Sequence, residues 1–481
     1  MMSRRTLIQH LAFVITVDER DRVLHDAAIV VHDDRIEAVG LTEEVRAALP
    51  PEGADTVLDG RRLGAVPGFV DTHVHLSETL SRASFPDNLT TRPWVFHWVM
   101  PYYGHMSAED EAVSVTLAAL EMVQAGTTCF LDMGALRDPA STIPTIARVG
   151  IRGVTGRHAA DVRPTEAPPG WTEEMMQGHF FPNADAALEV LEQTVRDWNG
   201  YADGRIRCWV NIQGKEPCSA DLHLGARTLA ERLGVGTTYH IASTAEESEN
   251  VERRYGRTPV ARIASLGGLG NNLVLAHAVA VAESEIAMLA EQGTKVAFCP
   301  GASMKLAKGA AVIGKYPEMM ESGVTVGLGT DGVSASGNLS LMRQIHLVAG
   351  MFKDSRRDPD MIGARRALRM ATIDGARALL WDDEIGSLEP GKKADFVLFD
   401  LDHPQWVPCE DPVQALVWSA TPSSIAETWI DGRPVYRRGT FEAMPDTASL
   451  FEEARERAAA LVRRAGLDQP DVPVTTTLYN N

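Results

Sequence analysis

Short apolar runs alternate with amphipathic stretches from Pro67-Gly68 to about residue 380. Apolar runs of this length are typical of buried strands, and the stretches between them follow the 3.6-residue period of helices. The clearest helix is predicted over residues 107–125, where Ser107 is the N-cap, Asp110 follows three residues later and Gly126 ends it. The eight predicted strands cover residues 69–75, 127–133, 151–158, 206–213, 236–242, 272–279, 295–299 and 324–331.

Both ends of the chain are richer in short β-type runs and turn residues. A strand is expected over 394–400 and a hairpin over 429–436, with Asp431-Gly432 as its turn. The predicted fold class is therefore α/β: a (β/α)8 TIM barrel with a small β-sandwich domain built from both chain ends. The expected domains are residues 1–65 and 381–440 for the sandwich, 66–380 for the barrel, and 441–481 for a C-terminal helix and tail.

Composition narrows the range of partners and compartments. The 481 residues include 46 Lys and Arg against 65 Asp and Glu, so the net charge is −19. An acidic chain argues against nucleic acid or an anionic membrane surface, and a small-molecule substrate is expected instead. The five cysteines contain no Cys-x-x-Cys pair, and no apolar run is long enough to span a membrane, so we expect a cytoplasmic protein. We read the apolar start of the chain as a first strand.

The strongest chemical signal is the pair His73 and His75 at the end of the first predicted barrel strand. Residues i and i+2 of a strand point to the same side, so both imidazoles aim at one place. Carboxyl ends of barrel strands form the active-site rim, and two imidazoles at this spacing suit Zn²⁺ or a similar ion. Asp71 precedes them on the same face, from which it could orient a ligand.

Three further polar residues fall late in other predicted strands: His240 in the fifth, His277 in the sixth and Asp331 in the eighth. Any one of them alone would most often be a hydrogen-bonded structural residue. Because all three fall at the same rim as His73 and His75, the sequence predicts a metal site there.

These motifs resemble the amidohydrolase superfamily of metal-dependent hydrolases. The resemblance rests on residues 67–75, the strands of His240 and His277, Gly329-Thr330-Asp331-Gly332, and two later stretches, 370–379 and 385–395. It extends from the N-terminal β segment to Tyr436. The chain most resembles the branch that contains s-triazine hydrolases, S-adenosylhomocysteine and guanine deaminases, and hydrolases of ureas and thiocarbamates.

The resemblance implies a role for each matched position. His73, His75, His240 and Asp331 would bind one divalent metal ion, Zn²⁺ or alternatively Fe²⁺, Co²⁺ or Mn²⁺, which activates a water. Asp331 would accept the proton of that water. His277 would orient the nucleophile or polarise the electrophile, and so contact the substrate.

The sequence departs from this branch at Ser243. Its deaminases and triazine enzymes carry a Glu there, in a His-x-Ala-Glu pattern, which moves a proton to a ring nitrogen. A serine hydroxyl does not ionise near neutral pH. We therefore expect hydrolysis of an amide-, urea- or carbamate-type C–N bond of a small organic substrate. The alternative is an aminohydrolase or dechlorinase acting on a purine, pterin or s-triazine ring, in which Glu246 or Glu247 replaces the missing Glu. A non-catalytic assembly protein on the same fold is a remote alternative, since such proteins lose the metal ligands.

Other residues at the rim are candidates for substrate contact. Two-metal relatives place a carboxylated Lys at the end of the fourth strand, where Gln213 lies nearer the expected place than Lys215, so one metal is favoured. An aromatic run after the first strand contains Trp98, and a long insertion after the third begins near His158. Trp98, His158 and Gln213 are the predicted substrate-binding residues, together with His277. The charged helix over 445–465 suggests a solvated or subunit-packing face, and a homo-oligomer, a dimer or larger, is expected.

Overall fold

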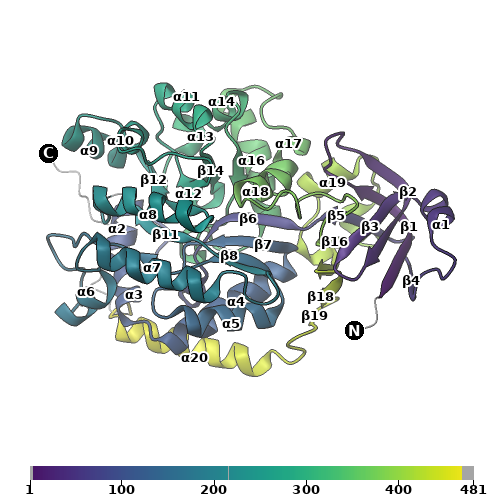
Figure 1. Ribbon diagram of the computed structural model, residues 1–481, viewed down its shortest axis with the longest axis horizontal. Helices are drawn as coiled ribbons and strands as arrows, with labels where there is room; N and C mark the ends of the chain where they lie inside the picture. Colours follow the sequence, from purple (N-terminus) through teal and green to yellow (C-terminus); the bar gives the residue numbers. More distant parts are fainter. Residues whose placement is uncertain (1–3, 215, 469–481) are drawn as a thin grey trace.

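A ring of parallel strands wrapped by helices fills most of the molecule, and a β-rich unit lies at one end of it (Figure 1). The computed structural model describes residues 4–214 and 216–468. The predicted strands of the ring are all present. They are β6 (Phe69–Val74), β7 (Thr127–Asp132), β8 (Arg152–Thr155), β9 (His158–Ala159), β10 (Ile206–Cys208), β11 (Val210–Gly214), β12 (Thr237–Ile241), β13 (Leu273–His277), β14 (Lys295–Phe298) and β15 (Val326–Leu328).

The third and fourth predicted strands are each divided in two. β8 pairs with β10 and β9 with β11, all parallel, so the strand order around the ring is preserved across both breaks. β15 and β6 lie side by side without a ladder between them, and the amide of Asp331 donates to the carbonyl of His73 over 2.8 Å. The fold is thus TIM-barrel-like, with parallel pairing in two sheets of four and six strands.

The two chain ends meet in one sheet, as the sequence predicts, because β5 pairs with both β1 and β16. The expected sandwich is not confirmed: the described strands of this unit pair in a single nine-stranded sheet. A register shift lies between Ile8 and Leu11 of β1, beside His10 with its φ of 58°. The strands are β1 (Arg5–Ile15), β2 (Val23–His32), β3 (Arg35–Leu41), β4 (Thr56–Asp59), β5 (Leu63–Pro67), β16 (Phe396–Asp400), β17 (Ile425–Ile430), β18 (Arg433–Arg437) and β19 (Thr440–Phe441).

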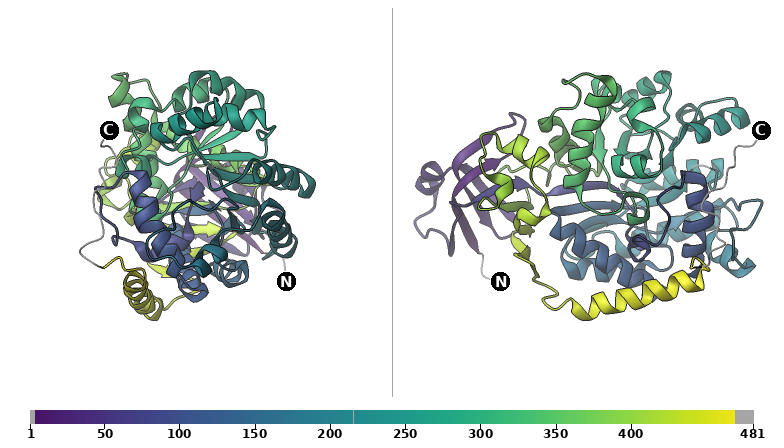
Figure 2. Two further views of the ribbon diagram at one scale, coloured as in Figure 1. Left: turned by 90° about the vertical axis from the view of Figure 1, so that its left-hand side faces the viewer. Right: turned by 180° about the vertical axis from the view of Figure 1, so that it is seen from behind.

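Helices cover the outside of the ring. α4 begins with the predicted capping box, since Ser107 accepts from the amide of Asp110 and the Asp110 carboxylate accepts from the amide of Ser107. The predicted C-terminal helix, α20, runs along the outside of the barrel and packs against α4 (Figure 2). The longer helices are α4 (Ala108–Gln124), α5 (Pro139–Val149), α7 (Ala184–Trp198), α8 (Ala220–Leu233), α9 (Ala245–Tyr255), α11 (Glu283–Glu291), α16 (Leu341–Arg356) and α20 (Ala448–Arg464).

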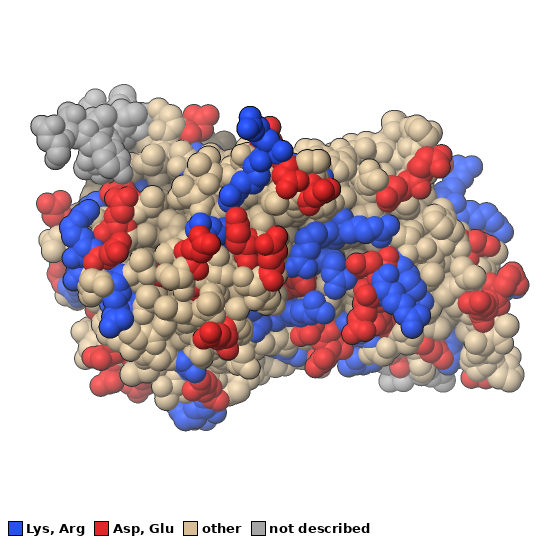
Figure 3. Space-filling view, turned by 90° about the horizontal axis from the view of Figure 1, so that it is seen from above, with Lys and Arg blue, Asp and Glu red and all other residues tan. Residues whose placement is uncertain are grey.

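Surface charge is mixed rather than segregated on the face seen from above (Figure 3). Lys and Arg lie beside Asp and Glu there, so the net charge of −19 does not create a single acidic patch on this face. No helix among the described residues combines the length and apolarity needed to cross a membrane.

Candidate active site

Five predicted residues meet at the carboxyl ends of the barrel strands. His73 lies on β6 and His75 directly after it, His240 lies on β12, His277 ends β13, and Asp331 follows β15. The ring centroid of His73 is 5.0 Å from that of His75, 5.1 Å from that of His240 and 5.2 Å from that of His277. Strands far apart in sequence therefore deliver one compact polar cluster, as the sequence predicts.

The spacing of the ring nitrogens fits a single tetrahedral ion. Asp331 Oδ1 is 3.7 Å from His73 Nε2 and 3.6 Å from His75 Nε2, and His75 Nε2 is 3.2 Å from His240 Nε2. Tetrahedral zinc ligands about 2.0–2.2 Å from the ion are about 3.3–3.6 Å from one another. Because these three separations, 3.2–3.7 Å, lie close to that spacing, the donor set fits zinc.

The surroundings of His240 and His73 suit both rings to bind a metal ion. His240 Nδ1 lies 2.8 Å from the carbonyl oxygen of Gln213, so Nδ1 carries the proton and Nε2 keeps its lone pair. His73 is fully buried, and neither of its ring nitrogens has a hydrogen-bond partner. Buried polar atoms are normally hydrogen-bonded, so an orphaned imidazole facing a carboxylate is what a metal ligand looks like without its ion.

Asp71 supports the site from behind, as the sequence suggests. Its carboxylate accepts from the amide of His73 and from both the amide and the hydroxyl of Thr330. Burial raises the pKa of Asp71 to about 7, against the pull of these hydrogen bonds. Asp71 therefore ties β6 to the segment that carries Asp331, and it fixes where two of the candidate ligands stand.

The two carboxylate oxygens of Asp331 face different groups. Oδ1 faces His73 and His75, whereas Oδ2 lies 3.7 Å from His277 Nε2 and 3.9 Å from Lys308 Nζ. Burial opposes ionisation, but His73, His277 and Lys308 together hold the pKa of Asp331 well below its usual value. The side chain is thus a carboxylate, as both a metal ligand and a proton acceptor must be.

Sequence reasoning missed Glu78, which stands beside the candidate ligands. Its carboxylate accepts from the hydroxyls of Tyr103 and Ser334 and lies 4.0 Å from His75 Nδ1. Burial raises the pKa of Glu78 to about 7, and the charge of Asp331 raises it further. Nothing in the sequence marks this residue, because the two hydroxyl groups that hold its carboxylate come from segments more than twenty positions away.

Lys308 was missed for the same reason. It follows β14, in the turn between α12 (Pro300–Lys305) and α13 (Ala310–Ile313). Its side chain is only 2% exposed, and Nζ lies 3.3 Å from His277 Nε2 and 3.4 Å from His277 Nδ1. Lysine side chains are almost never fully buried in proteins unless they are paired, so a buried ammonium at a candidate active site is uncommon.

Backbone strain gathers at the same rim. Ala242, His277 and Asp331 all have positive φ, at 47°, 73° and 62°. Non-glycine residues adopt this left-handed region only where the surrounding structure enforces it, and such residues cluster at functional sites. The strain turns each strand end sharply as it leaves the barrel.

The departure at Ser243 is visible in the structure. Ser243 is fully buried, its hydroxyl has no hydrogen-bond partner, and its amide donates to Glu247. Glu246 lies 3.4 Å from Arg92, in an exposed pair. The two acidic residues that could have replaced the missing Glu are thus engaged at the start of α9.

The predicted substrate-contact residues Trp98, His158 and Gln213 are buried or half-buried side chains with unpaired polar atoms. His158 and Trp98 are buried, and His158 Nε2, Trp98 Nε1 and Gln213 Oε1 have no hydrogen-bond partner. His179 stands 6.2 Å from the His158 ring, centroid to centroid. Trp98 belongs to a cluster of buried apolar side chains that reaches α20, so part of its role is packing. Lys215 is the lysine that was considered as a ligand of a second metal ion, and it lies outside the described residues.

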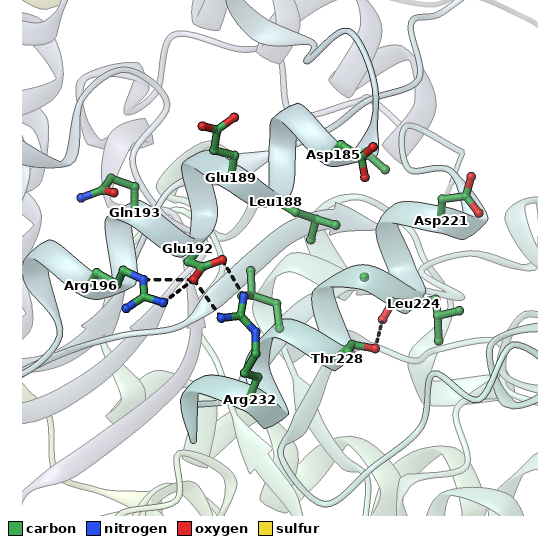
Figure 4. A pocket seen from close by; sticks show the side chains of 13 residues that line it. Asp185, Leu188, Glu189, Glu192, Gln193, Arg196, Asp221, Leu224, Thr228 and Arg232 are labelled. Atoms are coloured by element: carbon green, nitrogen blue, oxygen red, sulfur yellow. Dashed lines mark hydrogen bonds and ion pairs between the residues drawn. The ribbon is translucent and has the colours of Figure 1, made fainter.

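A surface groove between α7 and α8 lies on the outside of the barrel (Figure 4). It has a volume of 680 Å³, and Glu192 bridges Arg196 and Arg232 in its wall. None of the candidate metal ligands lines this groove, so it is no part of the metal cluster.

Comparison with known proteins agrees with this geometry. Residues 65–435 match the model of the amidohydrolase family. The chain belongs to this family. A 5-methylthioadenosine/S-adenosylhomocysteine deaminase of Desulforamulus reducens is 32% identical over 451 residues, 94% of this chain and 98% of the relative.

Solved structures extend the likeness to the fold. A zinc-bound adenosine deaminase of Xanthomonas campestris superposes with a TM-score of 0.83 at 26% identity, covering 95% of this chain and 98% of its own. A triazine hydrolase of Arthrobacter aurescens reaches 0.83 at 23% identity, covering 95% and 99%, which shows the shared fold. The resemblance drawn from the sequence is thereby confirmed. The amidohydrolase described here is an enzyme, a metal-dependent hydrolase of carbon–nitrogen bonds other than peptide bonds.

Proposed function

We propose that the enzyme cleaves the C–N bond of a small amide-, urea- or carbamate-type substrate at a mononuclear zinc site. His73, His75, His240 and Asp331 would hold the ion, supported by the spacing of their donor atoms. The bound ion would supply a water of lowered pKa and polarise the substrate carbonyl. Trp98, His158 and Gln213 would line the substrate side of the pocket.

In this proposal Asp331 transfers the proton, and the neighbouring histidines stay neutral. Asp331 Oδ2, which is held ionised, takes the proton from the attacking water and later returns it to the departing nitrogen. His277 faces the same oxygen, and Tyr316 donates a 2.7 Å hydrogen bond to the His277 carbonyl, which fixes the strained end of β13. Burial keeps His73 and His75 neutral, since it lowers the pKa of both.

A single observation carries the choice of substrate class: the buried, non-ionisable Ser243. Attack on a heteroaromatic ring carbon needs a proton delivered to a ring nitrogen, and Ser243 cannot deliver one. A carbonyl carbon needs no such proton, because its oxygen takes up the charge. The Glu247 carboxylate accepts a hydrogen bond from the Ser243 amide, which also supports a carbonyl substrate rather than a heteroaromatic ring.

One ion rather than two is supported by Lys308. Its ammonium lies 3.3 Å from His277 Nε2, where a second divalent cation bound to His277 would be repelled. Two other groups of side chains have donor atoms within 4.8 Å of one another and could also hold an ion. One group is His73, His240 and His277, and the other is His73, Cys299 and Asp331. Burial raises the pKa of the Cys299 thiol well above its usual value, which makes it a poor ligand.

A second candidate function is hydrolytic deamination of a purine ring. The names of the relatives favour it, since the Desulforamulus reducens protein is called a 5-methylthioadenosine/S-adenosylhomocysteine deaminase and the Xanthomonas campestris one an adenosine deaminase. In this case another group near the site would have to protonate the ring.

A substrate panel separates the two candidates. The zinc-reconstituted enzyme is offered matched amides, ureas, carbamates, purines and triazines, and the released product is identified. Release of an amine from the carbonyl compounds is the expected result. Release of ammonia from purines alone would overturn the carbonyl proposal in favour of deamination. Metal analysis should give one ion per chain, and two would refute the mononuclear site.

A further inference from the structure

We propose that Lys308 is a substrate-binding cation, whose ammonium hydrogen-bonds the oxygen that becomes negative when the carbonyl of the substrate is attacked. The proposal rests on the proposed function and narrows it. It assigns to the site a substrate with an acceptor oxygen next to the scissile bond. It also names a residue that none of the sequence motifs includes.

The position of the ammonium is the first argument. Lys308 Nζ lies 3.3 Å and 3.4 Å from the two ring nitrogens of His277, and 3.9 Å from Asp331 Oδ2. This is the oxygen that faces away from His73 and His75. Lys308 therefore lies on the side of Asp331 where the proton is transferred, and a substrate that meets His277 meets Lys308 as well.

The local backbone is the second argument. Ala307 and Gly309, on either side of Lys308, both have positive φ, at 50° and 83°. The Lys308 amide donates to the carbonyl of Ser303 over 2.9 Å, and the Ala310 amide donates to the Ser303 hydroxyl. A left-handed alanine is strained, and such strain persists where the fold over-determines it. Here the turn carries the lysine inward instead of into solvent.

Charge is the third argument. Burying an ammonium is costly unless an anion compensates it. Asp331 would share its negative charge between the metal ion and Lys308. Besides Asp331, the buried carboxyl groups of Glu78 and Asp71 lie near the candidate ligands. An ammonium beside Asp331 Oδ2 would stabilise an oxyanion that develops on the substrate more in the transition state than in the ground state.

The chemistry balances without any further reagent. The water oxygen forms a bond to the carbonyl carbon, the π pair of the C=O moves onto its oxygen, and Asp331 takes the water proton. Lys308 keeps its own proton and donates a hydrogen bond to the new oxyanion. When the oxyanion collapses, the C–N bond breaks and the nitrogen leaves with the proton held by Asp331.

Ser243 and Lys308 are complementary in this account. The branch that this chain resembles carries an acid at the position of Ser243 and acts on rings whose nitrogen accepts a proton. Here that position is uncharged, and a fixed cation stands beside His277. A fixed ammonium is a hydrogen-bond donor that suits an oxygen acceptor.

The test compares binding of two probes that share a phenyl group. Phenylphosphonate presents tetrahedral anionic oxygens, whereas phenylurea presents a neutral, planar carbonyl. Both are titrated calorimetrically into the zinc-loaded wild type, Lys308→Met, Lys308→Gln and Lys315→Met. Lys315 is the matched control, because it pairs with the exposed Glu283 and its removal deletes one positive charge outside the site. Zinc content and circular dichroism are recorded for every variant.

We expect both Lys308 variants to bind phenylphosphonate at least tenfold more weakly, with the affinity for phenylurea changed less than threefold. Lys315→Met should match the wild type for both probes. Equal phenylphosphonate affinity in wild type and the Lys308 variants, or no binding to the wild type, would overturn the assignment. This result is independent of turnover, so it stays distinct from the case in which the substrate panel rejects the carbonyl proposal.

Discussion

Replacement of Gly332 with alanine, which adds a single methyl group, should disturb the candidate site strongly. A Cβ built on Gly332 would lie 2.0 Å from Glu78 Oε2 and 2.6 Å from Glu78 Cδ, well inside contact distance. The Glu78 carboxylate cannot simply swing away, since the hydroxyls of Tyr103 and Ser334 hold its two oxygens. The backbone of Gly332 has φ −65° and ψ 152°, which alanine adopts freely, so the effect is purely steric.

The cost of Gly332→Ala can be worked out from these contacts. Overpacking a buried site costs about 1–3 kcal/mol, and loss of one hydrogen bond to the buried carboxyl adds about 1–2 kcal/mol. For a domain of this size we take about 1–2 °C in Tm per kcal/mol, which predicts a loss of roughly 2–10 °C. Gly363→Ala is the control, because nothing lies within 4 Å of its Cβ position and its φ is −72°.

A double-mutant cycle with Glu78→Ala then assigns the cause. Removing the carboxyl removes the clash, so adding Gly332→Ala to the Glu78→Ala protein should cost less than about 0.5 kcal/mol. Thermal unfolding followed by circular dichroism gives all four values. If Gly332→Ala destabilises the Glu78→Ala protein as much as it does the wild type, the steric argument fails.

Three further predictions concern the metal, the missing Glu and acid stability. His73→Ala should abolish turnover and lower zinc content while the circular dichroism spectrum stays native; full activity would remove the metal assignment. Ser243→Glu should not raise activity on the native substrate, since it buries a carboxylate at a fully buried position; strong activation would mean that the natural site is a damaged deaminase. Burial beside Trp171 and Phe180, with Arg157 nearby, lowers the pKa of His179 to about 3. Below pH 6.5 the unfolded chain therefore binds a proton that the folded chain refuses, and stability falls by up to about 2 kcal/mol by pH 5. His179→Gln should flatten that loss in Tm between pH 7 and 5, and an unchanged slope would contradict it.

The sequence alone determined the ring of strands and the candidate ligands. Apolar runs, a capping box and an Asp-Gly turn are local signals, so β6 to β15, α4 and the hairpin of β17 and β18 lie where they were predicted. The carboxyl ends of parallel barrel strands lie at the same rim. This rule alone predicts that five side chains lie close together: His73, His75, His240, His277 and Asp331. Each of these inferences needed only spacing along the chain and the geometry of a strand.

Only the tertiary structure decided which strands of the two chain ends pair, the breaks in two barrel strands and the surroundings of the candidate ligands. β5 pairs with β1, about fifty positions earlier, and with β16, more than three hundred positions later. Glu78 meets Ser334, and Lys308 meets His277, across separations that leave no periodic trace in the sequence. Their burial and electrostatics arise from neighbours brought together by folding, which is why the sequence predicts the candidate ligands but not the charges that act on them.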